Sequence, residues 1–182
     1  WLETRLAHLA NEKEFNRQRD KLSQERRDMP WYKLDKSYAF EGPNGTESLA
    51  DLFDGRSQLV VQHFMYGPDW EEGCPSCSFW ADGYDGFVTH LAHRDISMVT
   101  ISNAPLEKLD AYKKRMDWRF KWVSSLGSDF NRDFDVTFTP EEMEKEEVYY
   151  NYRKTTFPAS EAPGISVFFK DDAGDIYHTY SC

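Results

Sequence analysis

The chain has 182 residues, 40% of them hydrophobic and 16% aromatic, which is enough for one domain with an ordinary core. Its formal net charge of −10, from 22 basic and 32 acidic residues, disfavours nucleic acid and anionic membrane surfaces as partners. No apolar run approaches the roughly 20 residues of a membrane span, and the charged N-terminus does not resemble a signal peptide. We expect a cytoplasmic protein, in a chain trimmed at both ends because it begins at Trp1 and stops at Cys182.

Residues 1–29 predict a charged helix. Its apolar residues form a partial stripe at helical spacing, namely Leu2, Leu6, Leu9, Phe15 and Leu22. Met29-Pro30 ends the helix, because proline lacks an amide hydrogen and restricts the residue before it. We interpret residues 1–30 as an N-terminal helical extension with a solvated charged face, packed on the domain or on a second subunit.

Residues 31–182 alternate between strand-like and helix-like patterns. Strands are expected at 31–40, 59–64, 96–102, 122–125, 148–152, 165–170 and 176–180, the last two joined as a hairpin. Helices are expected at 78–93, with a kink at its two glycines, and at 105–116, with short helical turns at 48–53 and 140–147. Residues 130–139 and 155–164 are expected to be loops. A strand–helix–strand unit followed by a hairpin predicts an α/β fold, a central mixed sheet with helices on both faces.

The stretch from Gln58 to Trp80 combines an apolar strand, a turn, the sequence Cys74-Pro75-Ser76-Cys77 and an amphipathic segment. A dithiol at the start of a helix suits thiol chemistry, because a helix N-terminus stabilises a thiolate. We assign Cys74 as the nucleophile and Cys77, one turn further and more buried, as the resolving thiol. The alternative is a pair of cysteines that only packs.

Two residues between the cysteines have separate interpretations. Pro75 suits the first position of a helix. Ser76 either donates a hydrogen bond to a sulfur or is a solvent-facing spacer.

Cys182 is interpreted as an incidental thiol, with an intermolecular disulfide as the alternative. The four remaining histidines outside the first helix are too scattered for a four-ligand zinc site, so we expect no metal and no other cofactor.

The neighbours of the dithiol are open to more than one interpretation. Trp70 either covers the dithiol and shapes a substrate groove or belongs to the core. His63 is interpreted as a core histidine rather than a catalytic one, and Trp80 as core. Asp82 is either a buried proton acceptor for Cys77 or an exposed residue. Three acidic residues add negative charge that opposes the helix dipole near Cys74: Asp69, Glu71 and Glu72.

The strand, the Cys-Pro-Ser-Cys dithiol and the following helix resemble the thioredoxin-like superfamily. More narrowly, the sequence resembles a thioredoxin-like family called domain of unknown function number eight-nine-nine, labelled as predicted dithiol–disulfide oxidoreductases. The matching stretches are 52–59, 63–70, 73–82, 104–109, 122–125, 127–131, 166–168 and 178–181. The resemblance implies a thioredoxin-like fold in residues 31–182 and a redox role for the dithiol. It also implies that a cis-proline faces the dithiol, with Pro163 as the best match, and that a final segment follows residue 182.

The resulting hypothesis is a thiol–disulfide oxidoreductase, with a disulfide-containing protein or small thiol as substrate and a second dithiol as electron donor. A second hypothesis is a thiol peroxidase of peroxiredoxin-like type, although the Thr-x-x-Cys pattern of those proteins is replaced here by Cys-x-x-Cys. A third is a non-catalytic thioredoxin-fold binding module. The N-terminal helix is expected to form a homodimer contact.

Overall fold

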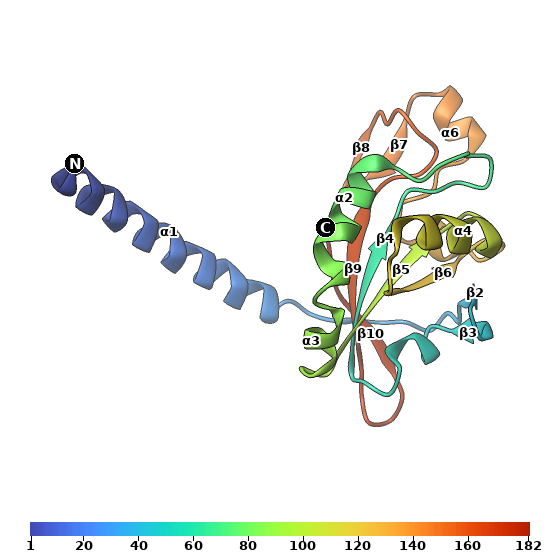
Figure 1. Ribbon diagram of the computed structural model, residues 1–182, viewed down its shortest axis with the longest axis horizontal. Coiled ribbons are helices and arrows are strands. Elements are labelled where there is room, and N and C mark those ends of the chain that lie inside the picture. Colours follow the sequence, from blue (N-terminus) through green and yellow to red (C-terminus); the bar gives the residue numbers. More distant parts are fainter. The chain divides into compact units, whose positions relative to one another are not determined.

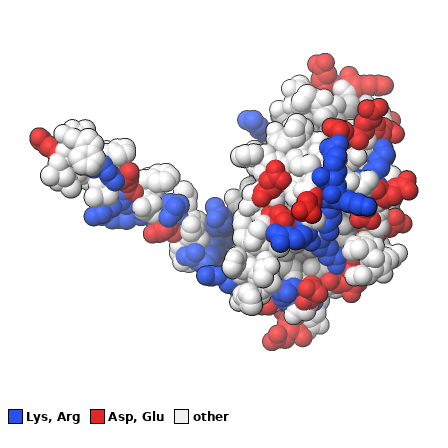
Figure 2. All heavy atoms as spheres, in the orientation of Figure 1, with Lys and Arg blue, Asp and Glu red and all other residues white.

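The computed structural model describes all 182 residues, which form two compact units, Trp1–Trp31 and Tyr32–Cys182. The first unit is one long helix, α1 (Leu2–Arg27), which ends three residues before Pro30. Acidic and basic side chains alternate along it (Figure 2), as in the pair Arg17–Glu14 at 2.7 Å. Within this unit no residue is buried. The helix predicted from the sequence is therefore present, with its apolar stripe exposed.

The second unit contains an eight-stranded mixed sheet in the spatial order β1-β10-β9-β4-β5-β6-β2-β3 (Figure 1). In chain order the strands are β1 (Tyr32–Lys33), β2 (Ala39–Gly42), β3 (Gly45–Ser48), β4 (Gln58–His63), β5 (Ile96–Ser102), β6 (Lys121–Ser124), β9 (Gly164–Lys170) and β10 (Ile176–Ser181). Strands β4, β5 and β6 are parallel, and β9 is antiparallel to both β4 and β10. The strand before the dithiol is thus in the middle of the sheet.

The remaining elements are short. The helices are η1 (Asp51–Phe53), α2 (Pro75–Asp85), α3 (Val88–Ala92), α4 (Leu106–Met116), α5 (Phe130–Asp133) and α6 (Pro140–Glu144), and β7 (Val148–Tyr150) pairs with β8 (Arg153–Thr155) in a small second sheet. No helix of the structure is both long enough and apolar enough to cross a membrane.

Side chains alternate across the sheet and form two apolar clusters. One joins Leu59, Val61 and Ile101 to residues of η1 and α5, and the other joins Trp122 to the buried faces of α2 and α4, including Leu109. Helices therefore cover both faces of a mixed sheet, which confirms the predicted fold class.

Several elements differ from the sequence prediction. The helix expected at 78–93 breaks into α2 and α3 around Gly86, where glycine lowers helix stability. Residues 130–133 form one helical turn rather than loop, and strands β3 and β8 were not predicted. The expectation that Trp80 belongs to the core is wrong, because its side chain is 51% exposed on α2.

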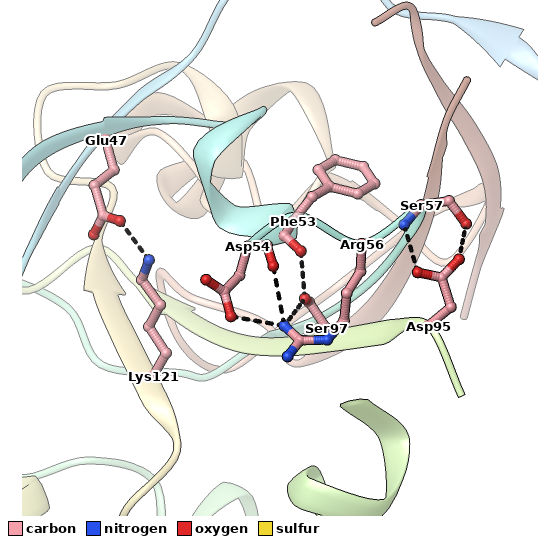
Figure 3. Close-up of polar contacts among 8 residues, drawn as sticks. All are labelled: Glu47, Phe53, Asp54, Arg56, Ser57, Asp95, Ser97 and Lys121. Atoms are coloured by element: carbon pink, nitrogen blue, oxygen red, sulfur yellow. Dashed lines mark hydrogen bonds and ion pairs between the residues drawn. The ribbon is translucent and has the colours of Figure 1, made fainter. Parts of the chain in front are cut away.

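Polar contacts fasten the edge of the sheet opposite the dithiol, where β4 and β5 begin (Figure 3). Arg56 donates to the Asp54 carboxylate at 2.7 Å and to the Ser97 hydroxyl at 3.1 Å, and Asp95 accepts from both the amide and the hydroxyl of Ser57. These contacts tie the start of β4 to the start of β5. They fix the parallel register that positions the far end of β4, where the dithiol lies.

Candidate functional site

The dithiol begins α2, after a loop that follows β4. Cys74 is the N-cap residue, its amide donates to the Met65 carbonyl at 3.0 Å, and its own carbonyl accepts from the Ser78 amide at 3.0 Å. The Ser78 hydroxyl donates to the same carbonyl at 3.0 Å and lies 3.0 Å from the Tyr112 hydroxyl of α4. The first turn of α2 is therefore held at both its backbone and a side chain, which fixes the position of Cys74.

The two thiols lie in different environments. Cys74 is half-buried, whereas the Cys77 side chain is buried at 2% exposure, and both cysteines are free thiols. The pKa of the Cys77 thiol is raised to about 12, chiefly by burial. A backbone hydrogen bond from Met65 lowers this pKa, whereas the neighbouring Cys74 sulfur raises it. Cys77 therefore stays protonated at neutral pH, while Cys74 is the thiol that solvent reaches.

A cluster of aromatic rings supports the loop and the start of α2. Phe64, Tyr112 and Trp118 pack with Trp122 at centroid distances between 4.7 and 6.1 Å. Gly73, directly before the dithiol, is buried against this cluster, and a Cβ atom there would lie 2.7 Å from the Phe64 ring. Glycine is therefore needed at this position for the chain to pass so close to the rings.

The sequence-predicted neighbours of the dithiol lie around it in different ways. Trp70 is half-buried and packs against the same cluster as Cys74, while its ring contacts Gly67. Pro75 is exposed at the first helical position, and Ser76 is exposed and forms no hydrogen bond with either sulfur. Asp82 is exposed and accepts from the Trp118 indole at 2.7 Å.

The acidic residues near the dithiol all face solvent, which limits their effect on the site. Asp69, Glu71 and Glu72 are exposed, and the Glu72 carboxylate pairs with the Arg115 guanidinium at 2.6 Å. Solvent and this pairing screen their charge.

Pro163 directly precedes β9, whose first residue is Gly164. The Pro163 carbonyl accepts a hydrogen bond of 2.7 Å from the Tyr150 hydroxyl. Burial raises the pKa of Tyr150, and the charges of Cys77 and Cys182 raise it further. The expectation of a cis peptide bond at Pro163 is wrong: every bond in the chain is trans, the lower-energy form.

Sequence reasoning missed a hydrogen-bonded series of four side chains from β4, β9 and β10. His63 Nε2 lies 2.8 Å from the Ser166 hydroxyl, which lies 2.9 Å from the Ser181 hydroxyl, which lies 2.7 Å from His178 Nε2. All four line a cavity of about 490 Å³, and so does Cys182, whose backbone pairs with Ile165. These residues are far apart in the sequence, and only the alternation within 165–181 hints at a shared face.

His63 is buried, as expected for a core histidine, but its Nδ1 atom has no hydrogen-bond partner. Burial lowers the pKa of His63 to about 3, so the ring is neutral at physiological pH. No group of three or more histidine, cysteine or acidic residues is arranged to hold a metal ion.

The sheet order, the flanking helices and the dithiol at the N-terminus of α2 define a thioredoxin-like fold. The chain belongs to the family described as "Bacterial protein of unknown function (DUF899)", whose model it matches over residues 1–182. No curated protein matches the chain.

Solved structures share its fold at low sequence identity. Peroxiredoxin Q from Xanthomonas campestris matches with a TM-score of 0.52 and 12% identity, covering 79% of this chain and 78% of that one. The bacterioferritin comigratory protein of the same organism, described by its alkyl peroxide reduction activity, matches with a TM-score of 0.50, 12% identity and the same coverage. Peroxidoxin BcpB from Mycobacterium tuberculosis matches with a TM-score of 0.47 and 14% identity, covering 78% of each chain.

Proposed function

We propose that the protein is a thiol–disulfide oxidoreductase in which Cys74 is the nucleophile and Cys77 the resolving thiol. The observation that carries the proposal is the contrast between the two thiols at the start of α2. Cys74 is accessible at the N-cap, and Cys77 is 2% exposed, one turn away, with its pKa raised to about 12. A dithiol with one exposed and one protonated, buried member attacks a substrate through the exposed sulfur alone.

The reaction proceeds in two exchanges. The Cys74 thiolate attacks one sulfur of a substrate disulfide, forms a mixed disulfide and releases the other substrate sulfur as a thiolate. Cys77 then loses its proton to that leaving thiolate and attacks the Cys74 sulfur. This step closes the Cys74–Cys77 disulfide and releases the second substrate thiol. Two electrons pass from the protein to the substrate, and another dithiol must return them. A cytoplasmic dithiol donor fits this requirement.

Around the dithiol, the backbone and the rings hold the reacting atoms in place. The Met65 and Ser78 contacts fix the N-cap, and the Tyr150 hydroxyl bonded to Pro163 holds the loop before β9. Trp70 is proposed to contact the substrate because it is half-buried and packs against the same cluster as Cys74, and Pro163 because it is half-buried in the loop that Tyr150 holds. Pro75 starts the helix, and Ser76 is proposed to serve as the exposed spacer between the sulfurs.

The test is reduction of hydroxyethyl disulfide by the reduced protein and three single variants. Cys74→Ser is expected to abolish reduction. Cys77→Ser is expected to accumulate a mixed disulfide at Cys74, visible as an adduct by mass spectrometry. Cys182→Ser is the matched control and is expected to behave as the parent protein. Reduction that survives Cys74→Ser would refute Cys74 as the nucleophile, and a parent protein that reduces no disulfide would favour the binding-module hypothesis.

A second function, peroxide reduction, is favoured by one observation, the fold shared with peroxiredoxin Q at a TM-score of 0.52. In that reaction the Cys74 thiolate attacks a peroxide and becomes a sulfenic acid while an alcohol or water leaves. Cys77 then condenses with it to a disulfide and releases water. Peroxide consumption, with a dimedone adduct trapped at Cys74 in the Cys77→Ser variant, would establish it. Disulfide reduction without that adduct would exclude it.

A further inference from the structure

The cavity beside β9 and β10 shares Tyr150 and Pro163 with the loop before β9, but the two thiols lie outside its lining. It has a volume of about 490 Å³, and neither Cys74 nor Cys77 lines it. Such a volume lies in the range of small-molecule sites. Its walls come from β1 and the segment after it, from the residues that follow α5, and from the β9–β10 hairpin.

Aromatic rings form much of the wall. They are contributed by Tyr32, Tyr38, Phe134, Tyr150 and Tyr152. The face of an aromatic ring attracts a cation within about 6 Å of its centroid. One cation already uses this environment, because the Lys36 ammonium lies 5.6 Å from the centroid of the Tyr38 ring.

The charges on the wall also favour a cation. Three carboxylates line the cavity, those of Asp35, Asp133 and Asp135, against the single ammonium of Lys36. The Lys36 ammonium pairs with the Asp133 carboxylate at 2.6 Å. It also pairs at 2.9 Å with the carboxylate of Asp129, a residue that does not line the cavity. The Asp135 carboxylate forms no ion pair or hydrogen bond in the structure. An anionic ligand would be repelled by this wall, whereas a cationic ligand finds a free carboxylate.

Arg132 is the cation that acts on the Asp135 carboxylate, but it is already bound elsewhere. Its guanidinium binds the Glu142 carboxylate at 2.7 Å and the Thr137 carbonyl at 2.6 Å.

His63 also lines the cavity. Its side chain is 2% exposed, and its Nδ1 atom has no hydrogen-bond partner. With the ring proton on Nε2, facing Ser166, Nδ1 is an acceptor that no protein group satisfies.

We propose that this cavity binds a small organic cation that carries an ammonium group and a hydroxyl or other donor. The ammonium lies among the tyrosine rings with Asp135 as its counter-charge, and the donor faces the histidine–serine series. The rings, the uncommitted carboxylate and the unsatisfied buried imidazole are independent features that converge on one space. The proposal does not depend on the redox function.

The probe is choline, and its neutral isostere is 3,3-dimethyl-1-butanol, which keeps the shape and the hydroxyl but lacks the charge. Calorimetric titration of the whole protein at low salt is expected to show choline binding at least about tenfold tighter than the isostere. Asp135→Asn is expected to weaken choline binding by about fivefold or more and to leave the isostere unchanged. Asparagine tolerates the left-handed backbone of this residue (φ 56°).

Two further variants keep the test decisive. Asp172→Asn removes a charge from the exposed β9–β10 turn, away from the cavity, and is expected to bind choline as the parent does. Tyr32→Leu, at a ring that is 69% exposed, is expected to weaken choline binding without altering the fold. The proposal is overturned if choline and its isostere bind equally, if choline fails to bind at tens of millimolar, or if Asp135→Asn and Asp172→Asn have the same effect.

Discussion

The burial of His63 makes the stability of the protein depend on pH. The pKa of His63 is lowered from its ordinary value of 6.5 to about 3, chiefly by burial. Between pH 6.5 and about pH 3, His63 is therefore protonated in the unfolded chain but neutral in the folded chain. The contribution is fully present above about pH 6.5 and is lost as the pH falls toward 3.

The magnitude follows from the two pKa values. Between pH 7 and pH 5, proton binding by the unfolded state costs the folded state about 2 kcal/mol of unfolding free energy. His63→Gln keeps an amide that can donate to Ser166 and removes the titration. Urea denaturation at pH 7 and pH 5 measures the unfolding free energy that each protein loses between these values. This loss is expected to be about 2 kcal/mol smaller in His63→Gln than in the parent protein.

Other titrating groups are common to both proteins, so the difference between the two pH dependences isolates His63. Burial also lowers the pKa of His178, which acts on His63 electrostatically, but His178 is present in both proteins. The reasoning is refuted if the parent and His63→Gln lose the same unfolding free energy between pH 7 and pH 5. A direct NMR titration that places the His63 pKa near 6.5 would refute it equally.

Three further outcomes are expected. In a protein whose only cysteine is Cys77, iodoacetamide should react at neutral pH at least about a hundred times more slowly than with free cysteine, because the thiolate is scarce and buried; comparable rates by mass spectrometry would contradict this. Gly42→Ala should lower stability by about 1–3 kcal/mol in urea denaturation, because its Cβ would lie 2.0 Å from the Glu47 carboxylate that Lys121 binds. We propose that α1 forms a homodimer contact, so light scattering should show a dimer that Phe15→Glu converts to a monomer; a monomeric parent would contradict it.

The parts of the fold that the sequence predicted are those with a strong local pattern. The buried runs at β4 and β5 and the turn between β9 and β10 were located to within one or two residues, because continuous apolar residues and a polar five-residue turn identify them. Strand β3 was missed because Gly45–Ser48 is a polar segment at the edge of the sheet, where nothing requires an apolar residue.

The candidate site divides in the same way. The dithiol is a local motif, so its place at the start of α2 follows from four consecutive residues. The histidine–serine series depends instead on register, because β9 pairs His63 with Gly164 and β10 pairs Ser181 with Ser166. The first pairing joins residues about a hundred positions apart, and the second depends on the register of the β9–β10 hairpin, so no local pattern contains the series.

The exposed apolar side chains of α2 favour a protein as the substrate of the proposed oxidoreductase. Phe79 is 75% exposed and Trp80 is 51% exposed, two and three residues after Cys77. A ring that is covered on binding contributes about 1–2 kcal/mol, or roughly a five- to thirtyfold change in KM. Phe79→Ser is therefore expected to raise the KM for a protein disulfide such as insulin and to leave hydroxyethyl disulfide turnover unchanged.

The matched control is Phe87→Ser, which removes a phenylalanine that is 44% exposed beyond the end of α2, about three turns from the dithiol. Phe87→Ser is expected to change neither the KM for insulin nor the turnover of hydroxyethyl disulfide. A selective loss with insulin in Phe79→Ser alone would place a protein surface against the first turns of α2. Equal losses with both disulfides would mean that Phe79 acts on the dithiol itself, and unchanged insulin turnover would mean that the exposed rings do not contact the substrate.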